Sequence, residues 1–145
     1  MPTATRSEEG RVALLDTSAA IALVVEDHED HAATLKAVRG RRLGLAGHAW
    51  FETYSVLTRL PGARRRSPAD AARLLAHDFP VAAFLGEEEA VHLRQDLAQL
   101  GVSGGAVYDA LVAAAARQHK APLVSGDTRA TPLYEALGVA FEVIR

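Results

Sequence analysis

The sequence contains no cysteine, which excludes disulfide frameworks, zinc sites built on thiolates and cysteine nucleophiles. A chain without cysteine fits the reducing cytoplasm, where we expect the protein to reside. No apolar run approaches the roughly 20 residues that a membrane-spanning helix needs. Residues 1–10 are polar, unlike the apolar centre of a signal peptide. We therefore expect a cytoplasmic protein that does not contact membranes.

Lysine is nearly absent, because 14 of the 16 basic residues are arginine. The formal net charge of -2 gives no overall attraction for polyanions, so any contact with nucleic acid must come from local clusters. Arginine is the better bidentate partner of phosphate, although a GC-rich coding sequence would give the same bias. Two clusters are candidate RNA-binding groups: Arg39, Arg41 and Arg42, and Arg59, Arg64, Arg65 and Arg66.

The length of 145 residues suits one domain that buries roughly 70% of its extended surface. A hydrophobic share of 49% and a charged share of 23% are typical of a soluble globular chain and exclude a disordered one. No repeat, low-complexity segment or long linker divides the sequence. We expect a disordered extension over 1–10 and a single domain over 11–145.

Short apolar runs alternate with amphipathic segments along the whole chain. Strands are predicted at 12–15, 43–46, 79–85, 122–124 and 139–144, and helices at 18–25, 31–39, 48–60, 68–77, 87–100, 106–119 and 132–137. Gly44 weakens the second strand. The alternation predicts an α/β fold with a mostly parallel central sheet of four to five strands and helices on both faces.

The apolar positions of two helices predict which side chains face the core. The stripe on helix 48–60 consists of Trp50, Tyr54 and Leu57, and that on helix 106–119 of Tyr108, Leu111, Val112 and Ala115.

Two carboxylates follow predicted strands. Asp16 ends the run 12–15, and Asp127 ends the run 122–124. In open α/β sheets, ligands bind outside the carboxyl ends of the strands, which makes both residues site candidates. Each also has a structural explanation, because Asp16 suits a helix N-cap and Asp127 suits a Ser-Gly-Asp turn.

Two further carboxylates lie near the start of predicted helices. Glu52 falls in the first turn of helix 48–60, where an acid also favours the helix dipole. With Ser103 as N-cap, Asp109 falls in the second turn, where it gains little from the dipole and costs about 0.5 kcal/mol relative to alanine. Its small neighbours Ala106 and Ala113 leave room for a ligand, which favours a functional role over a solvated one.

Asp16, Glu52, Asp109 and Asp127 can face one rim of a parallel sheet. Each pair of carboxylates at about 4 Å would cost roughly 4 kcal/mol at an effective dielectric near 20. Either some of the four are protonated at neutral pH, or a hard divalent cation lies among them. Oxygen ligands favour Mg²⁺, with Mn²⁺ as a substitute, and the preference of Mg²⁺ for phosphate oxygens suggests phosphate ester chemistry.

Four motifs, in this order, resemble those of PIN-domain ribonucleases and, among them, VapC-type toxins. They are Leu14-Leu15-Asp16-Thr17-Ser18-Ala19, the segment 50–60 around Glu52, Gly104-Gly105-Ala106-Val107-Tyr108-Asp109-Ala110-Leu111, and Leu123-Val124-Ser125-Gly126-Asp127. Ser125 stands where many members have threonine, and it keeps the hydroxyl. The extra acid that some members carry after the fourth motif is absent from 128–131.

The resemblance implies a PIN-like three-layer fold and Mg²⁺-dependent endonucleolytic cleavage of RNA. Asp16, Asp109 and Asp127 would bind the metal, directly or through water, and Glu52 would complete the catalytic set. Thr17 and Ser125 would be supporting hydroxyls. The resemblance also implies a homodimer and an inhibiting antitoxin, and single-stranded loops of a structured RNA are the expected substrate. A standalone RNA-processing nuclease, an inactive RNA- or protein-binding module and a receiver-like domain phosphorylated on Asp16 are the alternatives.

Overall fold

A computed structural model describes residues 10–144. Its centre is a sheet of five parallel strands in the order β3-β2-β1-β4-β5. The strands are β1 (Val12–Leu15), β2 (Arg42–Ala46), β3 (Val81–Ala83), β4 (Leu123–Ser125) and β5 (Phe141–Val143). The predicted fold class and the predicted order of strands and helices are confirmed.

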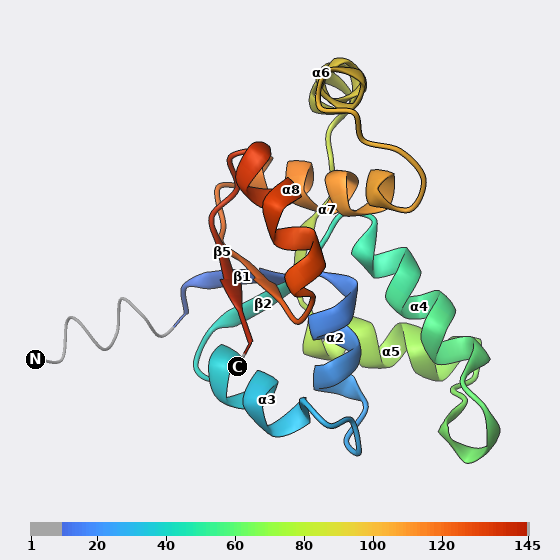
Figure 1. Cartoon of the computed structure of the whole chain (residues 1–145). Coiled ribbons are helices and arrows are strands. Elements are labelled where there is room, and N and C mark those ends of the chain that lie inside the picture. Colours follow the sequence, from blue (N-terminus) through green and yellow to red (C-terminus); the bar gives the residue numbers. More distant parts are fainter. Residues whose placement is uncertain (1–9, 145) are drawn as a thin grey trace, which may run out of the picture.

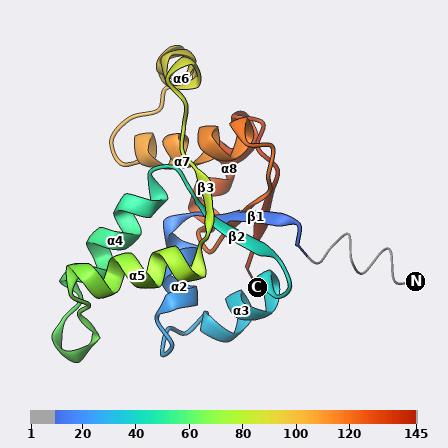
Figure 2. The ribbon, with the colours of Figure 1, turned by 180° about the vertical axis from the view of Figure 1, so that it is seen from behind.

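Helices cover both faces of this sheet, giving three layers (Figures 1 and 2). On one face are α2 (Thr17–Val24), α3 (His31–Val38), α4 (Ala49–Arg59) and α5 (Pro68–Asp78). On the other are α7 (Ala106–Gln118) and α8 (Thr131–Ala136), and α6 (Glu87–Gln99) packs against α7 farther from the sheet. Two short 3-10 turns, Gly62–Arg64 and Thr128–Ala130, complete the described residues. None of the helices in residues 10–144 is long and apolar enough to cross a membrane.

The first strand is the centre of both the sheet and the core. Leu15 of β1 lies in register with Leu45 of β2 on one side and with Val124 of β4 on the other. All three side chains are buried, as an apolar strand covered on both faces requires. From β1 the chain builds outward to β2 and β3, and then crosses to β4 and β5. The reversal of direction falls between β1 and β4, which is where open α/β sheets bind ligands.

The third strand is shorter than predicted. The run 79–85 was expected to be a strand, but only Val81–Ala83 pairs with β2. Phe79 instead ends α5 and is buried, and Phe84 lies beyond the strand with 48% of its surface exposed. Only Phe79 and Ala83 of this run are buried, so the apolar composition fixed neither the burial of the segment nor where sheet pairing stops.

The stripe predicted for helix 48–60 is confirmed in α4. Leu57 is buried, and Trp50 and Tyr54 pack partly buried against the core with their rings stacked at 5.6 Å. The predicted disordered extension over 1–10 lies outside the described residues except for Gly10, whose amide donates to Gly40 O at 2.9 Å.

Candidate active site

The four acidic residues come from four different elements. Asp16 directly follows β1, Asp127 lies two residues after the end of β4, and Glu52 and Asp109 lie in the first turns of α4 and α7. Burial raises the pKa of Asp109 to about 6, and the charges of Asp127, Asp16 and Glu52 add to the rise, while Arg129 opposes it. The fold therefore brings all four carboxylates within electrostatic reach of one another, at the carboxyl ends of the central strands.

Asp16 is the most buried of the four, with 5% of its surface exposed. Its Oδ1 accepts hydrogen bonds from the Ala19 amide at 3.0 Å and from Ser18 Oγ at 2.7 Å. Asp16 is thus the N-cap of α2, as the sequence suggested. The cap engages only one carboxylate oxygen, so it leaves Oδ2 for another role.

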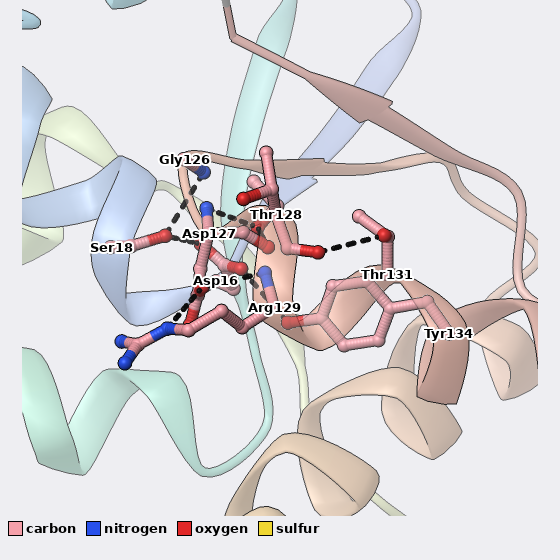
Figure 3. A network of polar contacts seen from close by, with 9 residues as sticks. Asp16, Ser18, Gly126, Asp127, Thr128, Arg129, Thr131 and Tyr134 are labelled. Carbon is pink, nitrogen blue, oxygen red and sulfur yellow. Dashed lines mark hydrogen bonds and ion pairs between the residues drawn. The ribbon is translucent and has the colours of Figure 1, made fainter.

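Tyr134 contacts that second oxygen. Its phenolic hydroxyl donates to Asp16 Oδ2 at 2.8 Å, and the tyrosine is fully buried in α8 (Figure 3). Burial and the adjacent Asp16 carboxylate raise the pKa of Tyr134 well above its usual range, so the hydroxyl keeps its proton. Sequence reasoning missed this residue. The only available signal was a tyrosine in an apolar helix next to the fourth motif, because a buried phenol needs a polar partner.

Ser18 joins the first and fourth motifs. Its Oγ donates to Asp16 and accepts from the Gly126 amide at 3.0 Å, so the start of α2 and the loop after β4 are bound together (Figure 3). The sequence placed Ser18 in a motif without indicating this contact, because its partner lies far away in the chain.

The two predicted hydroxyl groups hold backbone and side chains of the site. Thr17 Oγ1 donates to Glu52 Oε2 at 3.2 Å, and His48 Nε2 lies 3.4 Å from the other oxygen of Glu52. Ser125 is buried and its Oγ accepts from the Asp127 amide at 3.0 Å. Each hydroxyl thus fixes one of the acidic residues.

Arg129 places a basic side chain beside the acids, which was not predicted from the sequence. Its backbone amide and its Nε both contact Asp127 Oδ1, at 2.9 and 3.3 Å (Figure 3). The guanidinium is almost entirely exposed, with 91% of the side chain accessible. It can therefore contact both Asp127 and an anion in solvent.

The predicted arginine clusters lie elsewhere. Arg42 opens β2, so its cluster is at the opposite end of that strand from the acids. Within this cluster Arg41 pairs with Glu142 at 2.9 Å. In the second cluster, near the end of α4, Arg64 pairs with Asp27 and Arg65 donates to Leu60 O at 3.0 Å. The ion pairs of these clusters therefore involve Glu142 and Asp27 and not the four acids of the site.

The start of α7 differs from the prediction. Gly105, not Ser103, is the N-cap, and it makes no side-chain cap bond. Asp109 consequently lies in the first turn of the helix, where the dipole does favour a negative charge. Tyr108 was expected on the buried face but is 51% exposed. Val112 and Ala115 of the same stripe are buried as predicted, whereas Tyr108, near the start of the helix, is not.

The donor set suits a hard divalent cation, because four carboxylates provide oxygen ligands, and the charges of three of them add to the burial that raises the pKa of Asp109. Within residues 10–144, no three acidic, histidine or cysteine side chains are already gathered closely enough to hold a metal ion. The hydrogen bonds described above orient three of the carboxylates separately. The residues therefore fit a divalent cation in chemistry and position, and the side chains must draw closer to ligate it.

Comparison with protein families gives one match over most of the chain. The model for the PIN domain matches residues 13–135. Ribonuclease VapC27 from Mycobacterium tuberculosis is 50% identical over 125 residues, which cover 86% of this chain and 91% of that protein. Ribonuclease VapC40 from the same species is 40% identical over 131 residues, covering 89% of this chain and 96% of that protein.

Solved structures with a similar fold have much lower sequence identity. The VapBC2 structure from Rickettsia felis, bound to a DNA fragment from the promoter, aligns with a TM-score of 0.66 at 13% identity, covering 92% of this chain and 99% of that chain. The FitAcB structure from Neisseria gonorrhoeae aligns with a TM-score of 0.58 at 20% identity, covering 89% and 95%. These two likenesses concern the fold.

Proposed function

The chain belongs to the PIN-domain family, and on this premise we propose that it is a metal-dependent endoribonuclease and the toxin of a toxin–antitoxin pair. The observation that carries the proposal is the set of four carboxylates at the reversal point of the sheet, where burial and the charges of the other three acids raise the pKa of Asp109. Individual acids of the set have local structural roles, but bringing all four together costs repulsion that a divalent cation would neutralise. The identity of 50% with a ribonuclease over most of both chains supports the same activity.

Asp16, Asp109 and Asp127 would hold Mg²⁺, directly or through water, and Glu52 would complete the site. Mn²⁺ would substitute because it accepts the same oxygen ligands. When bound, the cation lowers the pKa of a water molecule and stabilises negative charge on the attacked phosphate.

The other residues of the site would orient these carboxylates and the substrate. Tyr134 and Ser18 fix the two oxygens of Asp16, and Thr17 fixes Glu52. Arg129 extends from Asp127 into solvent, where it would bind an RNA phosphate adjacent to the cleaved one. Arg59 and Arg66, both exposed, would contact phosphates farther along the RNA without reading its sequence.

The partners would be an antitoxin and a second copy of the chain. The antitoxin, which would cover the acidic site, is proposed on the family resemblance. A homodimer is proposed on the family resemblance alone.

The decisive experiment is cleavage of a structured RNA by the purified protein with Mg²⁺, with EDTA and with the Asp109→Asn variant. We expect cleavage only by the unaltered protein with Mg²⁺. Equal cleavage in all three conditions would overturn the nuclease. Failure of calorimetry to detect divalent-ion binding would instead favour the inactive binding module. A short antitoxin reading frame upstream of the gene is expected for a toxin, and its absence would favour a standalone RNA-processing nuclease.

A further inference from the structure

The first turns of α4 and α7 bring two aromatic rings together beside two of the acids. The rings of His48 and Tyr108 stack with centroids 5.0 Å apart and an angle of 18° between their planes. His48 precedes α4 and contacts Glu52 at 3.4 Å, and Tyr108 is the residue before Asp109. The ring pair and the acid pair therefore arise from the same two helix ends.

Tyr108 is half exposed although tyrosine on an alanine-rich helix would normally turn into the core. Its exposed fraction is 51%, and His48 covers one face of its ring. The face against His48 is not available to a ligand, which leaves the other face and the edge of the ring. A flat aromatic surface backed by a second ring and open to solvent is the geometry that proteins use to stack bases of unpaired nucleic acid.

We propose that the open face of Tyr108, supported by His48, stacks one base of single-stranded RNA beside the acidic site. The inference rests on the proposed function and deepens it by naming the substrate element that the site selects. A stacked base would anchor the strand next to the carboxylates, so that the neighbouring phosphate lies over them. Duplex RNA cannot offer a base in this way, because its bases are already stacked on one another.

Two other exposed rings distinguish this position from a general apolar patch. Phe51 and Phe84 are 56% and 48% exposed and lie 5.9 Å apart, with their planes tilted by 44°. Neither ring is stacked parallel to a neighbour, so neither presents a flat, supported face. Phe51 is consequently a matched control for the loss of an exposed aromatic side chain near the site.

The test is a double-mutant cycle, which combines changes of Tyr108 with removal of individual RNA bases and measures RNA affinity. Metal is left out so that the RNA stays intact. A single-stranded oligonucleotide is compared with variants in which each base in turn is replaced by an abasic ribose. For one position, we expect the abasic change to weaken binding to the unaltered protein by about tenfold. In Tyr108→Leu the same change should have little further effect, while Tyr108→Phe should behave like the unaltered protein. A 2-aminopurine at that position should lose fluorescence on binding to the proteins that keep the ring.

If the effects of the abasic change and of Tyr108→Leu on binding free energy were additive at every position, the stacking would be overturned. It would also be overturned if Phe51→Leu removed the effect of the abasic change to the same extent as Tyr108→Leu. A changed oligomeric state of Tyr108→Leu with unchanged RNA affinity would also overturn it and assign the ring to a protein contact. Cleavage with Mg²⁺ separates the two proposals. Coupling between Tyr108 and one base without RNA cleavage would support the stacking site and contradict the nuclease. Cleavage without this coupling would support the nuclease and contradict the stacking site.

Discussion

The hydroxyl of Tyr134 donates to Asp16 Oδ2 over 2.8 Å, while the amide of Ala19 binds the other oxygen of the same carboxylate. One buried acid therefore joins β1, α2 and α8. The contact fixes the rotation of the carboxylate about its side chain, which a helix cap alone would not do. We infer that Tyr134 is a positioning residue for Asp16.

Tyr134→Phe removes this hydrogen bond and keeps the ring. We expect a loss of about 1 to 3 kcal/mol in the free energy of unfolding, because a buried carboxylate oxygen loses its donor. Divalent-ion affinity should also change, since Oδ2 is no longer oriented. Urea denaturation and calorimetry with Mn²⁺ measure the two effects. Tyr54→Phe, which removes a hydroxyl from a partly buried ring on α4, is the control, and equal effects in both variants would contradict the positioning role.

Asp16 itself should separate capping from metal binding. Asp16→Ala removes the N-cap acceptor of α2 and should destabilise the protein by about 1 to 2 kcal/mol. Asp16→Asn keeps an acceptor for Ala19, and the Tyr134 hydroxyl can turn to accept from the new amide, so the loss should be smaller. Both variants should lose RNA cleavage. If Asp16→Asn cleaved RNA at nearly the rate of the unaltered protein, Asp16 would not be a metal ligand.

Periodicity and strand-end chemistry were sufficient to predict the α/β architecture, and the motifs predicted the acids. Apolar runs precede Asp16 and Asp127 in the sequence, and in the structure these runs form the adjacent parallel strands β1 and β4. Their ligand roles stay predictions, because no metal-ligand geometry exists in the described residues.

The long-range contacts of the site could not be predicted from the sequence, since only the fold brings their partners together. The bonds from Tyr134 to Asp16 and from Gly126 to Ser18 join residues 118 and 108 positions apart, whereas the N-cap at Asp16 is local and was predicted. Tyr108 was predicted to be buried because it fitted an apolar stripe whose members Val112 and Ala115 are buried, but its ring is half exposed and stacks on His48. Helical periodicity groups residues by face and cannot reveal where the neighbouring elements stop covering that face.

The raised pKa of Asp109 predicts how the stability of the metal-free protein depends on pH. Its pKa rises from 3.8 to about 6 on folding, so the folded protein binds more protons than the unfolded chain between these values. Stability from this group is thus complete below about pH 4 and is lost as the pH rises through about 6. We expect Asp109→Asn to be more stable than the unaltered protein at pH 7 by about 1 kcal/mol, a value discounted for partial exposure. The difference should vanish near pH 4, as measured by denaturation at both pH values.

Divalent cations should relieve the same repulsion. Adding Mn²⁺ at pH 7 should raise the melting temperature of the unaltered protein, and a concentration of about 100 times the Kd would stabilise it by about 2.7 kcal/mol. Asp109→Asn should show a much smaller rise. An equal rise in both proteins would place cation binding outside the acidic site.

Gly44 in β2 gives a test of the sheet that is independent of function. The sequence suggested that this glycine weakens the strand, but a Cβ at this position would lie 2.5 Å from the carbonyl oxygen of Val81 in β3. Because the clash is with backbone, β3 must move away, and Gly44→Ala should cost about 2 kcal/mol or more. Gly105→Ala is the matched control, since its backbone is helical and no atom lies within 4 Å of the new Cβ. It should leave stability unchanged or raise it by up to about 1 kcal/mol. Equal melting temperatures for the two variants would show that β3 accommodates the methyl group and that the glycine is not required for strand pairing.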